Sequence, residues 1–585
     1  MRGEALLIAS SDSPETGNLA KVLCFFGVTS RGLSAAEFLE DDSYGNSEKI
    51  RLVCSSDSFW ELITKSEQQP EGMRRWPECV HSVFVHAGDN VAVLQSLLRK
   101  LTGNNAAAVT ALEGGGKEFL VADMADFCGP MSDLRITASD ATGAGAFVFR
   151  TSRCETADVI SVDRGVVFLK VRYQNVTVFL FAGTKIIDIE AQLTTGLFDI
   201  RNHVLAALPI VLYIKWAFPD TCWKAPETNA CLIIDDPLLS PTYGFVDFRE
   251  LLSLMRSHKF STNIAFIPWN WRRSDPHVVR IFTENPDHYS ISVHGCDHTQ
   301  AEFGSNDPEH LYRKVGQALK RMADHELRTG IHHDRVMVFP QGVFSEAAMS
   351  VLKRTDLIAA INNDTISADP HPRPITISDV WDIAIMVYSS FPIFTRRYPW
   401  EGIENFAFDI LLGKPCIAVI HHDFCRDHCA HLLDFIERVN ALRCGLIWRT
   451  LGEVVQRSCR QREISADVVE VDMYGTELRL ENRSEKGRRF VIRKRESDPS
   501  AIKEIRAQSG PIAWNFSEDR IAFEAELNPC EGEMIKLTFH ELNENGQTTE
   551  GVSYKAKTMM RRYLSEMRDN YITTTKSRLA DFVSR

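Results

Sequence analysis

Seven short apolar segments between residues 230 and 450 constrain the fold of this chain more than any other feature of its sequence. They read CLIIDD, STNIAFIP, YSISVHG, RVMVFPQG, LIAAINN, IAIMVYSS and CIAVIHHD. Helical segments separate many of them, for instance residues 248–258, 308–327 and 345–354. Strands that alternate with helices form parallel sheets, and about seven such repeats are enough to close a barrel. We therefore predict a distorted (β/α)7-8 barrel within an α/β chain, over residues 229–456.

Three of these apolar segments end abruptly in carboxylate or imidazole side chains. The first ends at Asp235 and Asp236, the third at His294, and the seventh at His421 and His422. In a βα barrel the carboxyl ends of the strands meet at one mouth, where the functional residues lie. We therefore expect these side chains to converge at that mouth.

The spacing of the histidines indicates a metal site. His294 and His298 are four residues apart, so on a helical turn both imidazoles lie on one face and can bind the same ion. Asp236 would complete a set of three protein ligands and leave open positions for water and substrate, as a catalytic metal site requires. Two carboxylates directly after the apolar residues 232–234 are also costly unless they are paired or bind a metal. The sequence therefore predicts a divalent metal ion, with Zn²⁺ as the leading candidate.

In this order the motifs resemble those of the NodB-homology polysaccharide deacetylases of carbohydrate esterase family four, over roughly residues 230–450. The resemblance implies that Asp235 is the catalytic base and that Asp236, His294 and His298 bind the metal. The family's Leu-x-His acid falls on His422, and His421 is the alternative if the strand register slips by one residue.

Two family motifs differ in this chain. The Arg-Pro-Pro-Tyr-Gly region reads VFPQG over residues 338–342, so it lacks both the arginine that holds the base and the aromatic residue. A backbone N–H near Gln341 or Gly342 could still bind an oxyanion, because that role needs no side chain. The Asp-Trp motif that orients the acid has a loose counterpart in DVWD, residues 379–382.

These residues predict the hydrolysis of an N-acetyl (amide) group, on an amino sugar or a saccharide precursor. Asp235 would take a proton from the attacking water, and His422 would give one to the departing amine. Trp269 and Trp271 follow the second apolar segment and would either stack on a sugar ring or pack at the rim. Two alternatives stay open: hydrolysis of another C–N amide bond at the same metal site, and a non-catalytic carbohydrate-binding or assembly protein.

Four further units are predicted around the barrel. Alternating strands and helices indicate a small α/β domain over residues 1–127, and strand-like segments indicate a β-rich linking unit over residues 128–228. Alternating apolar and polar residues predict a small β-sandwich over residues 465–545. A helix is expected over residues 553–585.

The predicted C-terminal helix is amphipathic and basic. It carries Met560, Leu564, Met567 and Tyr571 on one stripe, and from Tyr554 to the end it has eight Lys or Arg against three acids, a net of 8 − 3 = +5. Such a helix either docks on its own protein or contacts an anionic membrane surface or a partner.

Composition and charge limit the classes of function and the location that fit this chain. The formal net charge of −12 argues against a dedicated nucleic-acid binder, which usually needs a basic surface. The N-terminal residues do not form a signal peptide, and no segment approaches the roughly 18 apolar residues needed for a transmembrane span. Fourteen cysteines are scattered without regular pairs, which is typical of reduced thiols. We therefore expect a cytoplasmic protein that acts on a saccharide or another N-acylated small substrate, such as a nucleotide-linked or lipid-linked sugar.

Overall fold

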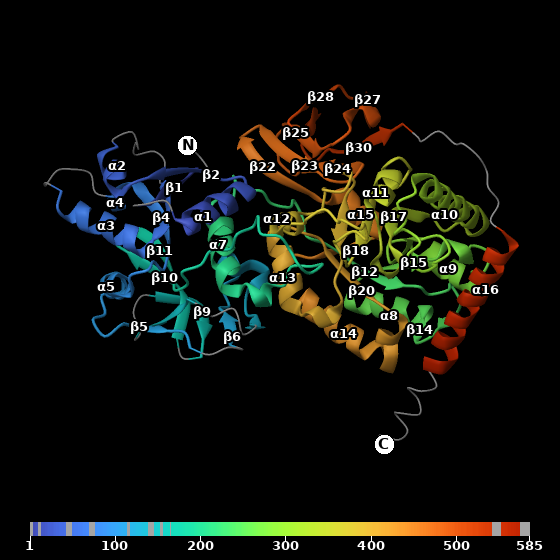
Figure 1. Cartoon of the computed structure of the whole chain (residues 1–585), viewed down its shortest axis with the longest axis horizontal. Coiled ribbons are helices and arrows are strands. Elements are labelled where there is room, and N and C mark those ends of the chain that lie inside the picture. Colours follow the sequence, from blue (N-terminus) through green and yellow to red (C-terminus); the bar gives the residue numbers. More distant parts are fainter. Residues whose placement is uncertain are drawn as a thin grey trace, which may run out of the picture.

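The computed structural model describes residues 4–9, 13–41, 50–69, 76–113, 117–138, 145–151, 156–163, 165–540 and 551–573. Figure 1 shows an N-terminal part in blue and teal, a curled barrel sheet in green and yellow, and an orange sandwich beside it. The red C-terminal helix lies against the barrel on the side away from the N-terminal part (Figure 1).

The N-terminal part is built on one mixed sheet whose strands follow the order β2-β1-β3-β4-β11-β10-β9-β6-β7, with β8 pairing with β10 and β5 with β8. Its first strands are parallel, and β9, β10 and β11 are antiparallel neighbours, as their alternating sequence predicts. The strand β11 pairs in parallel with β4, so residues 1–127 and 128–228 share one sheet. Pairing across this boundary covers a strand edge that each segment would otherwise leave open. The bounds are β1 (Glu4–Ile8), β2 (Thr29–Leu33), β3 (Ile50–Ser55), β4 (Val80–His86), β5 (Ala108–Ala111), β6 (Glu118–Val121), β7 (Arg135–Thr137), β8 (Phe147–Arg150), β9 (Thr156–Val162), β10 (Gly165–Tyr173) and β11 (Val176–Phe181).

A buried helix, α7 (Val204–Ala217), packs on this sheet and leads into the barrel. Its Tyr213 hydroxyl lies 3.1 Å from the hydroxyl of Ser82 on β4, and its Trp216 ring packs edge-on against Phe179 of β11. The helix therefore ties the two halves of the sheet together before the chain enters the barrel.

The barrel sheet is parallel and curled, in the order β19-β18-β17-β16-β15-β12-β20, with the short β21 (Ile447–Trp448) also pairing with β12. An isolated parallel bridge between Arg397 and Ala418 joins its two edges, β19 and β20. Helices α8 (Phe248–His258), α10 (Pro308–Thr329), α11 (Glu346–Lys353), α13 (Ile403–Leu412) and α14 (Arg426–Asn440) connect the strands. The strand bounds are β12 (Asn229–Asp235), β15 (Thr262–Phe266), β16 (Tyr289–His294), β17 (His333–Val338), β18 (Ala359–Asn362), β19 (Ile393–Thr395) and β20 (Cys416–Ile420).

The predicted sixth strand, residues 383–390, is wrong. That segment is buried but irregular, and Ser389 and Ser390 turn the chain with φ of 53° and 57°. The sixth barrel strand is instead β19, which the sequence analysis missed. A short apolar segment that is buried in a loop has the same pattern as a buried strand, so periodicity alone does not separate them. The correction places Arg396 at the carboxyl end of a barrel strand.

Side chains along the barrel strands alternate between the barrel interior and the surrounding helices. Ile233 of β12, Phe394 of β19 and Val419 of β20 belong to one buried core, whereas Ile234, Ile393 and Ile420 belong to the outer one. This alternation follows from the two-residue period of a strand. Two residues further on, the same period turns three polar residues toward the interior at the mouth: Asp235, Arg396 and His421.

A β-sandwich follows the barrel, with sheets β22-β23-β25-β29-β28 and β24-β30-β26-β27 packed around one core. The chain ends in α16 (Val552–Met567) and a π-helical turn, η9 (Arg568–Thr573), and residues 574–585 of the predicted helix lie outside the described residues. Within the described part of the chain, no helix is long and apolar enough to cross a membrane. The sandwich bounds are β22 (Cys459–Ser465), β23 (Val468–Met473), β24 (Glu477–Glu481), β25 (Arg488–Arg495), β26 (Ile502–Ala507), β27 (Gly510–Pro511), β28 (Trp514–Ser517), β29 (Arg520–Leu527) and β30 (Gly532–Phe539).

Candidate metal centre

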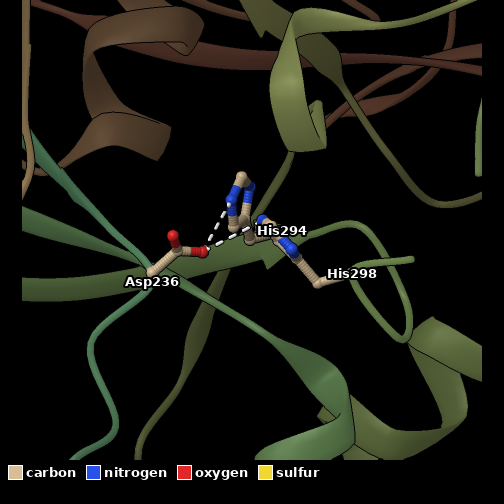
Figure 2. Close-up of side chains that lie close together, drawn as sticks. All are labelled: Asp236, His294 and His298. Carbon is tan, nitrogen blue, oxygen red and sulfur yellow. Dashed lines mark ion pairs between the residues drawn. The ribbon is translucent and has the colours of Figure 1, made fainter. Parts of the chain in front are cut away.

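Asp236, His294 and His298 come together at the mouth of the barrel (Figure 2). Oδ1 of Asp236 lies 3.4 Å from Nε2 of His294 and 3.0 Å from Nε2 of His298. One ligand atom from each residue lies within 4.8 Å of the other two. The predicted ligands thus form the one cluster of this kind among the residues that the structure describes.

The spacing of the two histidines predicts a helical turn, but the structure does not have one there. His294 is the last residue of β16, and His298 lies in the loop that follows. Gly295 and His298 turn this loop with φ of 65° and 55°. The buried carboxylate of Glu302 holds the loop, because it accepts backbone N–H groups from residues 296–299 at 2.8–3.4 Å. A Cβ at position 295 would lie 2.1 Å from Oε1 of Glu302, so this turn requires glycine.

The three residues fit a divalent metal ion. Nδ1 of His294 donates a hydrogen bond to the carbonyl oxygen of Val338 (2.9 Å), and this leaves the lone pair of Nε2 directed toward the cluster. Oδ1 of Asp236 is buried and receives no well-directed hydrogen bond. Burial raises the pKa of Asp236, but the imidazoles of His298 and His294 lower it more, so it lies well below its ordinary value. An ionised carboxylate and two imidazoles are a donor set suited to Zn²⁺.

Asp235, the predicted base, is held by an arginine that the sequence analysis did not identify. Nη1 and Nη2 of Arg396 donate to the two carboxylate oxygens of Asp235 at 2.7 and 2.8 Å. Only 4% of Asp235 and 2% of Arg396 are exposed. Burial raises the pKa of Asp235, but the charge of Arg396 lowers it more, so the net direction is down. Arg396 thus holds Asp235 in place of the arginine that the VFPQG segment lacks.

The two candidate acids point to different surroundings. His421 continues the inward set of β20 and stacks on the ring of Tyr398, with ring centroids 6.1 Å apart. His422 is buried and packs against Tyr243 and Phe245, in the segment that follows β12. Its Nε2 lies 3.6 Å from Oδ1 of Asp569, a residue of the C-terminal segment.

The other predicted site residues lie around the rim. Trp269 packs edge-on against Tyr563 of α16, and the guanidinium of Arg272 covers the ring of Trp271. The N–H of Gly342 donates to the carbonyl oxygen of Phe339 (3.3 Å), so of the two predicted oxyanion donors Gln341 remains the candidate.

The loose counterpart of the Asp-Trp motif, residues 379–382, makes structural contacts. Asp379 caps the short helix α12 (Ile377–Trp381) through Thr376. Asp382 accepts a hydrogen bond from Tyr474 and lies 3.4 Å from Arg460, both in the sandwich. These carboxylates therefore bind structural partners and do not contact either histidine.

No protein-family model matches this chain, and no curated protein sequence matches it. Among solved structures, it is similar to a protein from Mycobacterium smegmatis whose crystal structure is described as that of a polysaccharide deacetylase (15% identity, 41% of this chain, 93% of the other, TM-score 0.29). It is also similar to a family 4 carbohydrate esterase from Streptomyces lividans in complex with acetate (13% identity, 38% and 92%, TM-score 0.25). A third is a family 4 acetyl xylan esterase from Clostridium thermocellum in complex with a cobalt ion (13% identity, 39% and 90%, TM-score 0.24).

The chain resembles polysaccharide deacetylases and family 4 carbohydrate esterases. The motifs at Asp235, His294 and His422 predict the same resemblance.

Proposed function

We propose that residues 229–456 form a metal-dependent hydrolase that removes an N-acetyl group from an amino sugar or saccharide precursor, with Zn²⁺ as the metal. One observation carries the proposal: a three-ligand cluster lies directly beside a buried carboxylate that an arginine holds ionised. A three-ligand set leaves coordination positions open for substrate, and a fixed carboxylate beside it is suited to accept a proton.

Asp236, His294 and His298 would hold the ion, which lowers the pKa of a water molecule and polarises an amide carbonyl when it is bound. Asp235 accepts the proton of the water that attacks the carbonyl carbon, and Arg396 keeps this carboxylate oriented. The N–H of Gln341 donates to the oxygen that gains charge. His422 gives a proton to the nitrogen as the C–N bond breaks, because an amide nitrogen leaves poorly unless it is protonated. The products are acetate and a free amine.

His422, rather than His421, is the acid in this proposal. An acid acts on the leaving nitrogen, on the side of the scissile bond away from the base. His421 belongs to the inward-facing set that also contains Asp235, whereas His422 lies outside that set. A buried carboxylate near His422 also supports this role, since catalytic histidines are commonly oriented by a third group.

The test is acetate release by the metal-loaded full chain from N-acetylated amino sugars in free, nucleotide-linked and lipid-linked form. We expect one free amine per acetate with at least one substrate. General acid–base groups contribute roughly 10²–10⁴-fold, so Asp235→Asn and His422→Asn should each reduce kcat by about that factor. The matched variant His421→Asn should reduce kcat by less than about 10-fold, because it removes no proton donor. A larger loss in His421→Asn would make His421 the acid, and no acetate from any substrate would reject the proposed reaction.

A lipid-linked saccharide on the cytoplasmic side of a membrane is the substrate class that we propose. Support comes from the outer face of α16, where Met559, Met560, Leu564 and Met567 are 49–63% exposed. Lys555 and Lys557 are exposed beside them, whereas Glu566 of the helix and Asp569 of the following turn are buried. An exposed apolar stripe with basic flanks is typical of helices that lie on anionic membranes.

This substrate class predicts binding of the full chain to vesicles. We expect cosedimentation with phosphatidylcholine vesicles that contain phosphatidylserine, and at least about 10-fold weaker binding of the triple variant Met560→Ser, Leu564→Ser, Met567→Ser, since each buried methylene contributes about 0.8 kcal/mol. The control is Leu327→Ser, because Leu327 is a 90% exposed leucine of α10 that does not belong to this stripe. Unchanged binding of the triple variant would contradict the proposal. A dimer that the triple variant dissociates would instead identify the stripe as a contact between two copies.

A further inference from the structure

The C-terminal segment, residues 551–573, lies across the mouth of the barrel. It contacts the loops that follow four different strands, β12, β15, β16 and β20, and in Figure 1 it runs beside α9 (Pro276–Glu284) and β14 (Val246–Asp247). The predicted ligands Asp236 and His298 and both candidate acids also lie in the loops after the strands, and His294 is the last residue of β16. The contacts pair Tyr554 with Asp297 (2.9 Å), Glu566 with Arg273 (2.5 and 2.7 Å), Asp569 with Tyr243 (2.9 Å) and Asn570 with Gly244 (2.7 Å).

Asp569 is the residue of this segment that faces His422. It is 4% exposed, and its Oδ2 accepts a hydrogen bond from the hydroxyl of Tyr243. Its Oδ1 lies 3.6 Å from Nε2 of His422 and 2.7 Å from Nε of Arg568. Burial raises the pKa of Asp569, but the nearby imidazole of His422 and the hydrogen bonds from Arg568 and Tyr243 lower it to about 2. A buried, ionised carboxylate is costly unless such partners compensate it.

The hairpin of β13 (Thr242–Tyr243) and β14 holds the other side of the His422 ring. Gly244, at its turn, has a φ of 58°, and a Cβ there would lie 2.2 Å from Nδ1 of His422. The N–H of Gly244 in turn donates to Oδ1 of Asn570 (2.7 Å). The imidazole is therefore held between this hairpin and the C-terminal segment, with Nε2 toward Asp569. Its Nδ1 is buried and has no hydrogen-bond partner in the described part of the chain, so Nδ1 is the nitrogen that would donate to a substrate.

We propose that Asp569 is the positioning residue for His422, so that the C-terminal segment is a part of the catalytic site. The inference rests on the proposed function, because it assigns a partner to the proposed acid. An acid must keep one ring orientation and carry a positive charge while it holds the proton. A buried carboxylate beside one ring nitrogen meets both needs. The carboxylates at residues 379–382 do not, since they bind Thr376, Tyr474 and Arg460.

A double-mutant cycle on the full metal-loaded chain tests the inference. Asp569→Asn keeps the shape and an acceptor for Tyr243 but removes the charge. We expect it to lower kcat about 10-fold or more, with KM and metal content unchanged, as a share of the roughly 10²–10⁴-fold that a general acid contributes. In the His422→Asn background the same substitution should change kcat less than about 2-fold, because residues that act as a unit are not additive.

Tyr554→Phe is the matched control for docking of the segment. It removes two hydrogen bonds to the barrel, to Asp297 and from Lys314, and leaves Asp569 in place, so kcat should change less than about 3-fold. Equal losses from Asp569→Asn in both backgrounds would overturn the inference, because the effect would not act through His422. An increase in kcat would also overturn it, since the segment would then obstruct the site.

The imidazole ¹⁵N signals of His422 separate this inference from the proposed reaction. They should shift in Asp569→Asn and stay unchanged in Tyr554→Phe, whether or not acetate is released. Unchanged signals in both variants would overturn the contact itself. Shifted signals without acetate release from any substrate would reject the deacetylase reaction and keep the contact.

Discussion

Replacing Asp236 with asparagine is expected to abolish both metal binding and acetate release. The substitution removes the one anionic ligand of the cluster, and a set of two imidazoles and an amide binds Zn²⁺ far more weakly. Purified wild type should contain about one zinc or similar ion per chain by elemental analysis, the stoichiometry of a single three-ligand site. Asp236→Asn should contain almost none after the same dialysis.

Two histidine variants form a matched pair for the same measurement, one at a predicted ligand and one outside the cluster. His298→Ala should lose the ion as Asp236→Asn does, whereas His332→Ala should retain it, because the side chain of His332 is 89% exposed and pairs with Glu326. Circular dichroism of each variant checks that it is folded. A folded wild type that binds no ion even after incubation with Zn²⁺ would refute the metal site and favour the non-catalytic alternative.

The position of the cluster of Asp236, His294 and His298 was predictable because apolar segments in the sequence end at polar residues. Apolar segments that stop at Asp236 and His294 are typical of buried strands whose carboxyl ends carry polar groups, and parallel strands bring those ends together. The geometry between His294 and His298 was not predictable from spacing. A four-residue separation fits a helical turn as well as the glycine turn and the Glu302 contacts that the structure has.

Residues that act through distant partners were missed for a different reason. Arg396 was not identified because the apolar residues 383–390 have a strand-like pattern, and the true strand β19 has only three residues. Asp569 lies in a helix whose sequence indicates an amphipathic surface and nothing about the barrel. Its contact with His422 depends on how the chain returns after the sandwich, and no local pattern records that.

The sharing of one N-terminal sheet by residues 1–127 and 128–228 also depends on contacts between distant segments. The change from strand–helix alternation to strand–strand alternation near residue 128 is real, since β9, β10 and β11 are antiparallel. Whether such a change also separates two cores depends on the pairing of edges. Here β11 pairs with β4, and the sheet continues across the change.

Replacing Arg396 with leucine is expected to destabilise the barrel and to abolish turnover. The variant leaves Asp235 as a buried charge without its bidentate partner, and breaking such a pair costs about 3–5 kcal/mol. For a unit of this size that corresponds to a fall of about 6–20 °C in the melting temperature of the transition that contains the barrel, measured by calorimetry. The double variant Asp235→Asn, Arg396→Leu should recover a large part of this loss, because no uncompensated charge remains, yet it should release no acetate. Recovery of stability without activity would separate the two roles of Asp235. If Arg396→Leu alone melted within about 2 °C of wild type, less than 1 kcal/mol by the same relation, the pair would not be the buried interaction that the geometry indicates.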